Sequence, residues 1–269
     1  MYFPDVLSRR PRVAGAAGFS RGLYFLYHIQ TRGLPGRFIM KTRFYLPLLA
    51  LSLASACAAV PERRSGPDAY ADFEAMKAAN IEGLDYSREI YDRGSAVTVF
   101  AIHGGEIETS TSLVARRIAG KDFNLYIFNG WHGDSADLHV TATHFDDPDA
   151  VRLAARSALG VSVHAQADRG TWVCVGGADT AVAALVTQRL LAAGFEAETP
   201  CERLPGVSRR NIVNRPSSGG VQLELTLRLL ERLERSREEL SRFSDAVRLA
   251  VLESLPKLTN QPSVQETSK

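Results

Sequence analysis

Residues 103–108 gather one histidine, two glycines and two glutamates directly after an apolar, β-branched run. The run at 97–102 has the composition of a buried strand, and the glycines allow the backbone to turn sharply at its end. Such a turn can bring Glu106 or Glu108 back beside His103, and histidine together with carboxylate binds zinc. On these residues alone, a metal site and an ordinary polar loop at the surface are equally good interpretations.

Two further residues, His164 and Glu224, also lie in or at the end of an apolar run, as His103 does. The apolar run 160–164 closes on His164, and Glu224 is the only charged residue in the apolar run 221–225. A catalytic zinc commonly has three protein ligands and a water whose pKa it lowers to roughly 7. His103, one glutamate and His164 can supply three ligands, and Glu224 can carry the proton from water to a leaving amine. The alternatives are a hydrogen-bonded core histidine and a solvent-facing glutamate.

Strand-like and helix-like segments alternate along the chain, which predicts one α/β domain with a central mixed, largely parallel sheet flanked by helices. The predicted strands are 96–103, 124–128, 138–142, 160–164, 171–175 and 221–225. The predicted helices are 71–79, 110–119, 148–158, 179–193 and 226–254, the last broken near Ser244. Because ligands bind beyond the carboxyl ends of strands in such sheets, His103 and His164 are expected to share one site.

The composition is ordinary for a soluble globular protein, with 45% hydrophobic and 23% charged residues in a chain of 269. The net charge of +2 is unevenly distributed, because six arginines and one acid lie in residues 1–39. Without residues 1–56 the chain has 24 basic and 29 acidic residues, a net charge of −5. A mildly acidic body argues against general nucleic-acid binding. We expect no nucleic-acid partner and a monomer.

Residues 40–56 have the organisation of an export signal, with a basic start, a short apolar run and small residues before a cleavage point. The run is shorter than the ~20 residues needed to span a bilayer. Residues 1–39 are then interpreted as an extension from an upstream start codon, and a basic arm is the alternative. The segment before Cys57 resembles a bacterial lipoprotein cleavage box, so we expect either lipidation of Cys57 or plain signal cleavage nearby.

The mature protein is therefore expected to be exported, as a periplasmic or outer-membrane-anchored lipoprotein, with secretion as the alternative. Residues 57–70 are interpreted as a polar tether, 71–255 as the catalytic domain and 256–269 as a polar tail. Cys174 and Cys201 can pair in an oxidising compartment, but the sequence does not decide whether they meet.

Several short motifs occur in one order along the chain. They are His-Gly-Gly-x-Ile-Glu at 103–108, Leu-His-Val-Thr at 138–141, Phe-Asp-Asp-Pro at 145–148, Val-Ser-Val-His at 161–164, Val-Gly-Gly at 175–177, Asn-Ile-Val-Asn-Arg at 211–215 and Gly-Val-Gln-Leu-Glu-Leu at 220–225. This ordered set resembles the poly-γ-glutamate hydrolase family, zinc peptidases best known from phages of capsule-forming bacilli. The resemblance covers about residues 85–252 and implies a zinc-carboxypeptidase-like α/β fold with one catalytic Zn²⁺ per chain.

The resemblance also implies roles for individual residues. The family's glutamate ligand follows its first histidine by five positions, which selects Glu108 as the partner of His103. Glu106 stays the alternative, because it fits the broader carboxypeptidase pattern His-x-x-Glu. His164 becomes the third metal ligand and Glu224 the general base.

Poly-γ-glutamate offers a free α-carboxylate on every residue, so its pocket needs cations. Arg215 matches the family's Asn-Arg motif and can hold a carboxylate through two hydrogen bonds. Asn211 and Asn214 either orient substrate or cap turns, and His139, which matches a family position, either contacts substrate or belongs to the core. The net charge of −5 argues for a local pocket rather than a charged groove.

The leading hypothesis is an exported zinc hydrolase that cleaves the γ-glutamyl amide bonds of a γ-linked glutamyl polymer or peptide. One alternative is an amidase of the same chemistry that acts on peptidoglycan peptides. The other is a non-catalytic lipoprotein that has kept the fold and binds a polyanion or a partner.

Overall fold

The structure is a computed structural model that describes residues 68–131 and 135–259. The predictions for residues 1–39, for the export signal at 40–56 and for lipidation of Cys57 lie outside the described residues. Among the residues that are described, every helix is too short or too polar to cross a lipid bilayer.

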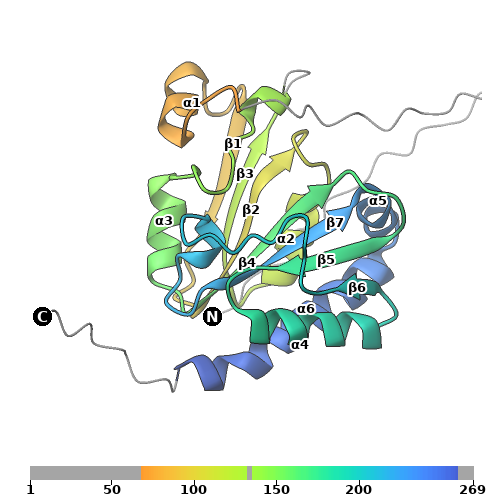
Figure 1. The fold of residues 1–269 in the computed structure, drawn as a ribbon. Coiled ribbons are helices and arrows are strands. Elements are labelled where there is room, and N and C mark those ends of the chain that lie inside the picture. The colour runs from red at the N-terminus through yellow and green to blue at the C-terminus, as the bar shows by residue number, and fades with distance from the viewer. Residues whose placement is uncertain (1–67, 132–134, 260–269) are drawn as a thin grey trace, which may run out of the picture. The chain divides into compact units, whose positions relative to one another are not determined.

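A mixed sheet of seven strands forms the centre of the described domain, in the order β1-β3-β2-β4-β7-β5-β6 (Figure 1). The strands are β1 (Tyr86–Tyr91), β2 (Val97–Gly105), β3 (Asn124–Gly130), β4 (Leu159–Gln166), β5 (Trp172–Gly176), β6 (Glu196–Glu198) and β7 (Gly220–Thr226). Strand β1 pairs antiparallel with β3, and β5 pairs antiparallel with β7, whereas the other four pairs are parallel. The prediction of a single α/β domain with a mixed, largely parallel sheet is confirmed.

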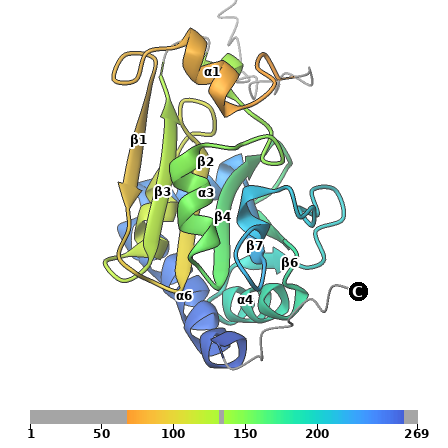
Figure 2. The ribbon, with the colours of Figure 1, turned by 90° about the vertical axis from the view of Figure 1, so that its left-hand side faces the viewer.

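Helices cover both faces of the sheet. They are α1 (Phe73–Ala79), α2 (Thr111–Ala119), α3 (Pro148–Ala155), α4 (Thr180–Ala192), α5 (Leu227–Arg235) and α6 (Arg237–Thr259), with the short 3-10 helices η1 (Ser135–Leu138) and η2 (Ile212–Asn214). Figure 2 shows α3 in front of the central strands and α6 behind them. Helices α2, α4, α5 and α6 cover one face, and α1 and α3 cover the other.

The two faces of the central strands differ in chemistry, because successive side chains point to opposite sides. Val163 of β4 and Leu223 of β7 point into the larger apolar core, beneath α2, α4, α5 and α6. On the opposite face, β2 and β3 carry an aromatic cluster that includes Phe100 and packs under α1 and α3. Further along this second face, β4 and β7 carry His164 and Glu224, both buried.

The predicted strand at 138–142 is wrong. The backbone at 135–138 forms η1, and the residues after it make a loop. In this loop the Thr141 N–H donates to the carboxylate of Asp68, and the Val140 carbonyl accepts from the ring of His103. Side chains, and not a neighbouring strand, thus satisfy these backbone polar groups. The alternation of apolar and polar residues at 138–142 is therefore not enough to identify a strand.

Three other differences concern the ends of the sheet and the last helices. The helical segment after β7 breaks at Ser236, which has an extended backbone, and not near Ser244, which is buried inside α6. Strands β1 and β6 were not predicted, because both are edge strands with polar, partly exposed residues. Helix α6 extends to Thr259, into residues that the sequence assigns to the tail.

A disulfide joins Cys174 of β5 to Cys201 in the loop after β6, with the two Cα atoms 5.1 Å apart. This settles the pairing that the sequence left open. Because Cys174 lies in the sheet, the disulfide ties the loop around Cys201 to a rigid strand.

Candidate metal centre

The site lies where β2 and β4 separate. The two strands pair only over residues 97–100 of β2, and the pairing of β2 with β3 shifts register between Ala101 and Gly104. A shift of this kind re-aims the side chains within it, here that of His103. From β2 the chain continues to β3 on one side, whereas β4 lies on the other side. His103 therefore lies beyond the carboxyl end of parallel strands, at the point where the strand order changes direction. This is where the sequence predicts a ligand site.

Two glycines make the turn after His103 possible. A Cβ atom on Gly104 would lie 1.9 Å from the Ser112 hydroxyl oxygen, and one on Gly105 would lie 2.3 Å from the Gly130 carbonyl oxygen. Gly105 also has a φ of +71°, a conformation that favours glycine. The chain then turns back, and the Glu108 N–H donates to the His103 carbonyl at 2.7 Å. The turn thereby returns the Glu108 side chain to the ring of His103.

His103, Glu108 and His164 converge on one point. Nδ1 of His103 lies 3.1 Å from Oε1 of Glu108 and 3.2 Å from Nδ1 of His164. Nδ1 of His164 lies 3.4 Å from Oε2 of Glu108, and all three side chains are buried. Tetrahedral zinc with bonds of 2.0–2.1 Å requires ligand atoms about 3.3–3.4 Å apart. The three side chains therefore form a possible metal site of the kind that zinc occupies, and Glu106 is exposed to solvent outside it.

Surrounding groups hold two of these side chains in place. Nε2 of His103 lies 2.9 Å from the Val140 carbonyl oxygen, and because a carbonyl only accepts, this nitrogen carries the proton. Nδ1 of His103 is then left with a lone pair for a metal. Oε2 of Glu108 accepts from the Ala165 N–H at 2.9 Å. Burial raises the pKa of Glu108, but the nearby His103 and His164 outweigh it and hold this pKa well below its ordinary value.

His139 packs directly on the site. Its ring lies 4.0 Å from the ring of His103, centroid to centroid, at an interplanar angle of 30°. Its Nδ1 lies 2.8 Å from Oδ1 of Asp68, a residue that the sequence assigns to the tether. The neighbouring His103 and burial lower the pKa of His139 to about 4, so this ring is neutral at pH 7. His139 thus packs against one side chain of the possible metal site, and about a quarter of its own side chain (26%) stays exposed.

Glu224 lies on β7 opposite His164 of β4, in register, and only 5% of it is exposed. Its Oε1 accepts from Nε2 of Gln222 at 2.9 Å, and Oε1 of Gln222 accepts from Nδ2 of Asn211 at 2.8 Å. This chain of side chains orients the Glu224 carboxylate. Gln222 is not among the site residues predicted from the sequence, although its position two residues before Glu224 puts both side chains on one face of the strand.

The other predicted substrate residues lie in the loop that leads to β7. Asn211 accepts from the Val213 N–H and so caps η2. The Asn214 amide accepts from the Ala178 N–H and donates to two backbone carbonyls of the loop. The Arg215 guanidinium lies 3.4 Å from the Arg210 carbonyl oxygen, which is its only hydrogen bond within the described part of the chain. The structure thus brings Asn211 to the general-base candidate through Gln222, and it places Arg215 along the loop.

Residues 70–246 match the sequence model of a family described as poly-gamma-glutamate hydrolase. The chain belongs to this family. The resemblance identified from the motifs is thereby confirmed, and the matched segment contains all the candidate site residues.

Relatives of this poly-gamma-glutamate hydrolase family member agree with that assignment. The SPbeta prophage-derived protein YoqZ of Bacillus subtilis strain 168 is 39% identical over 163 residues, which is 59% of this chain and 59% of YoqZ. The chain thus spans less than two thirds of that curated relative. The structure of a bacteriophage poly-gamma-glutamate hydrolase matches with a TM-score of 0.67 and 30% identity, over 71% of this chain and 100% of the phage chain. A zinc-free apo structure of YndL matches with a TM-score of 0.64 and 32% identity, over 70% of this chain and 99% of that chain.

Proposed function

We propose that this protein is a zinc-dependent hydrolase of γ-glutamyl amide bonds, with one Zn²⁺ held by His103, Glu108 and His164. The observation that carries the proposal is the convergence of three buried ligand atoms at the spacing of a tetrahedral metal site. The activity for which the family is named and the zinc-free state of the YndL structure support the choice of reaction and metal. The substrate class is poly-γ-glutamate or a related γ-linked glutamyl peptide.

Each buried residue of the site has a part in this chemistry. Zinc held by His103, Glu108 and His164 would polarise an amide carbonyl and lower the pKa of a water ligand to roughly 7. Glu224 receives a proton from the attacking water and delivers it to the nitrogen of the leaving amine. Gln222 holds the Glu224 carboxylate in position through Oε1, and Val140 holds the ring of His103 through Nε2. Each of these residues is at most 5% exposed, which limits the access of bulk water to them.

The loop before β7 is proposed to contribute to substrate recognition. Arg215 is the proposed contact for an α-carboxylate of the γ-glutamyl chain, because a guanidinium can pair with a carboxylate in two hydrogen bonds. Asn211 and Asn214 are proposed to shape this loop through their backbone contacts. His139 is proposed to form part of the wall beside His103.

The protein is also proposed to act outside the cytoplasm, as a monomer. Its export signal would end before Cys57, leaving a periplasmic or outer-membrane-anchored lipoprotein, with secretion as the alternative. The disulfide between Cys174 and Cys201 supports this location, because disulfides persist in oxidising compartments.

The proposed activity predicts release of free amines from γ-linked glutamyl peptides by the purified mature protein. Incubation with a strong zinc chelator should abolish this release, and added Zn²⁺ should restore it, because the metal activates the attacking water. Peptides of the same composition joined through α-amide bonds serve as the control substrate. Activity that survives complete zinc removal, or no cleavage of any γ-glutamyl amide, would contradict the proposal.

A further inference from the structure

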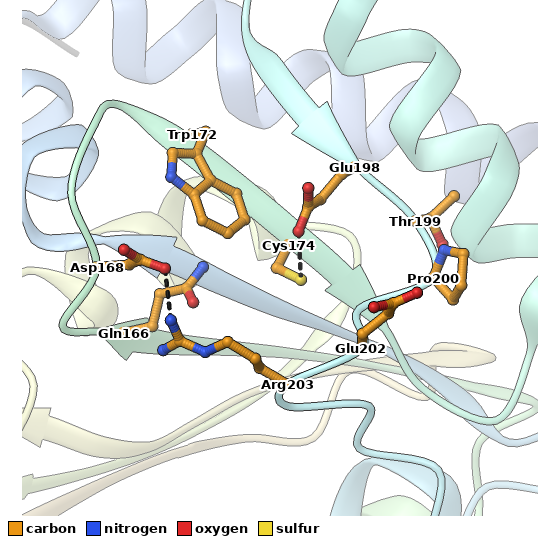
Figure 3. Close-up of a pocket in the computed structure, with 9 residues that line it drawn as sticks. All are labelled: Gln166, Asp168, Trp172, Cys174, Glu198, Thr199, Pro200, Glu202 and Arg203. Carbon is orange, nitrogen blue, oxygen red and sulfur yellow. Dashed lines mark hydrogen bonds and ion pairs between the residues drawn. The ribbon is translucent and has the colours of Figure 1, made fainter.

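Figure 3 shows an acidic pocket. The strand register puts its residues Cys174 and Glu198 on the face of the sheet that carries His164 and Glu224. The pocket has a volume of about 560 Å³, and its floor is formed by Gln166 of β4 and Cys174 of β5. Glu198 and Glu202 line it on one side. Trp172 provides an apolar wall. We define the acidic pocket by these five residues together with the ion pair of Asp168 and Arg203.

The acidic pocket adjoins the proposed general base. In the sheet, His164 lies opposite Glu224, Glu224 opposite Cys174, and Cys174 opposite Glu198. Register partners on adjacent strands share a face and lie about 5 Å apart. The pocket floor therefore lies on both sides of β7, with Gln166 on β4 and Cys174 on β5, and Glu198 lies roughly 10 Å from Glu224 across the sheet.

The charges of the acidic pocket favour a cation. Arg203 is already paired with Asp168, with 2.6 Å between the guanidinium nitrogen and the carboxylate oxygen. The carboxylates of Glu198 and Glu202 are exposed and have no cationic partner within residues 68–131 and 135–259. Glu198 does contact the Sγ atom of Cys174 at 3.4 Å, but a disulfide sulfur carries no proton that could neutralise it.

A buried acceptor on the pocket floor points to the same kind of ligand. Gln166 is only 2% exposed, and its Nε2 donates to the Glu224 backbone carbonyl at 2.8 Å. Because that carbonyl can only accept, the amide orientation of Gln166 is defined. Its Oε1 has no donor among the described residues and lines the cavity. An ammonium group, which donates three hydrogen bonds and accepts none, suits this oxygen and the two carboxylates that lack a cationic partner among the described residues.

The position of Glu224 decides which part of a substrate reaches the acidic pocket. Glu224 delivers its proton to the leaving amine, so the amine side of the amide lies on the Glu224 side of the metal centre. The residue that supplies this amine then extends over Cys174 toward Glu198. A glutamate there would place its own carboxylate against Glu198 and Glu202, which costs binding energy. The disulfide through Cys174 holds the wall that carries Glu202 in place.

We propose that the acidic pocket binds the side-chain ammonium of one substrate residue. This is the residue whose amine forms the scissile amide with the γ-glutamyl group. The preferred substrate is accordingly a γ-glutamyl peptide with a cationic residue after the scissile bond, and not a chain of glutamates alone. This inference rests on the proposed function and narrows its substrate class.

The test compares three peptides that differ only in the residue after the scissile bond: γ-glutamyl-lysine, γ-glutamyl-alanine and γ-glutamyl-glutamate. The zinc-loaded mature protein should hydrolyse the lysine peptide with a kcat/KM about tenfold above that for the glutamate peptide. The double variant Glu198→Gln, Glu202→Gln should lower kcat/KM for the lysine peptide about five- to tenfold, as expected for two exposed ion pairs. The same variant should change kcat/KM for the alanine peptide less than twofold. Glu231→Gln on α5, which lies on the opposite face of the sheet, is the matched control and should change none of the three.

The possible failures are distinguishable. Equal or better hydrolysis of the glutamate peptide by the wild type would overturn the inference while the proposed function stands. An equal loss for all three peptides in the double variant would also overturn it, because the pocket carboxylates would then act on stability or on the metal site. If none of the peptides is cleaved, the proposed function fails and the inference fails with it.

Discussion

Replacing Glu224 with glutamine is expected to lower kcat for γ-glutamyl amide hydrolysis by about 10²- to 10⁴-fold, the usual effect of removing a general base. The amide keeps the shape of the side chain and can still accept from Nε2 of Gln222, but it cannot take a proton from water. The fold and the metal site should therefore persist. Steady-state kinetics on a γ-glutamyl peptide, together with zinc analysis of the same sample, measure both effects.

The zinc content separates a catalytic role of Glu224 from a structural one. A Glu224→Gln protein that holds zinc like the wild type but hydrolyses slowly supports the proposed role. Full activity in this variant would show that another group moves the proton. A loss of zinc together with activity would show that Glu224 supports the metal site instead.

Replacing Glu108 with glutamine is expected to weaken zinc binding by at least about 100-fold. Loss of a residue that only hydrogen-bonds to a metal ligand lowers metal affinity by about 10- to 100-fold, and loss of a ligand should lower it at least as much. Glu108 is the one anionic member of the buried set, and its Oε1 lies 3.1 Å from Nδ1 of His103. A neutral amide removes the charge that balances the metal. Competition with a chromogenic zinc chelator measures the change in affinity.

Glu106→Gln is the matched control for this experiment. Glu106 lies two positions earlier in the same turn, and its side chain is exposed. Its replacement should leave zinc affinity within twofold of the wild type. The opposite pattern, with zinc lost in Glu106→Gln and kept in Glu108→Gln, would assign the ligand to the residue that the His-x-x-Glu pattern favours.

The sequence predicts the parts of this fold that depend on local patterning. Apolar runs that are buried on both faces mark the central strands, and a histidine at the end of such a run marks the edge where ligands bind. This pattern predicts that His103 and His164 share one site, and the structure brings them together. The choice of Glu108 over Glu106 needed the family pattern, because either spacing fits a turn through two glycines.

The remaining features depend on contacts between distant segments. The loop around Val140 alternates like a strand, but its partners are the side chains of Asp68 and His103. Gln222 acquires its role only because Asn211 is folded against it. The acidic pocket combines the end of β4 with the loop held by Cys201, and local periodicity contains no information about that contact.

The proposed activity depends on one zinc ion held by His103, Glu108 and His164. Diffraction from crystals of the zinc-loaded protein, recorded above and below the zinc absorption edge, tests it most directly. We expect one anomalous peak per chain, about 2 Å from Nδ1 of His103, Nδ1 of His164 and a carboxylate oxygen of Glu108. No peak between these three side chains, or a zinc peak elsewhere with this position empty, would show that they do not form the zinc site.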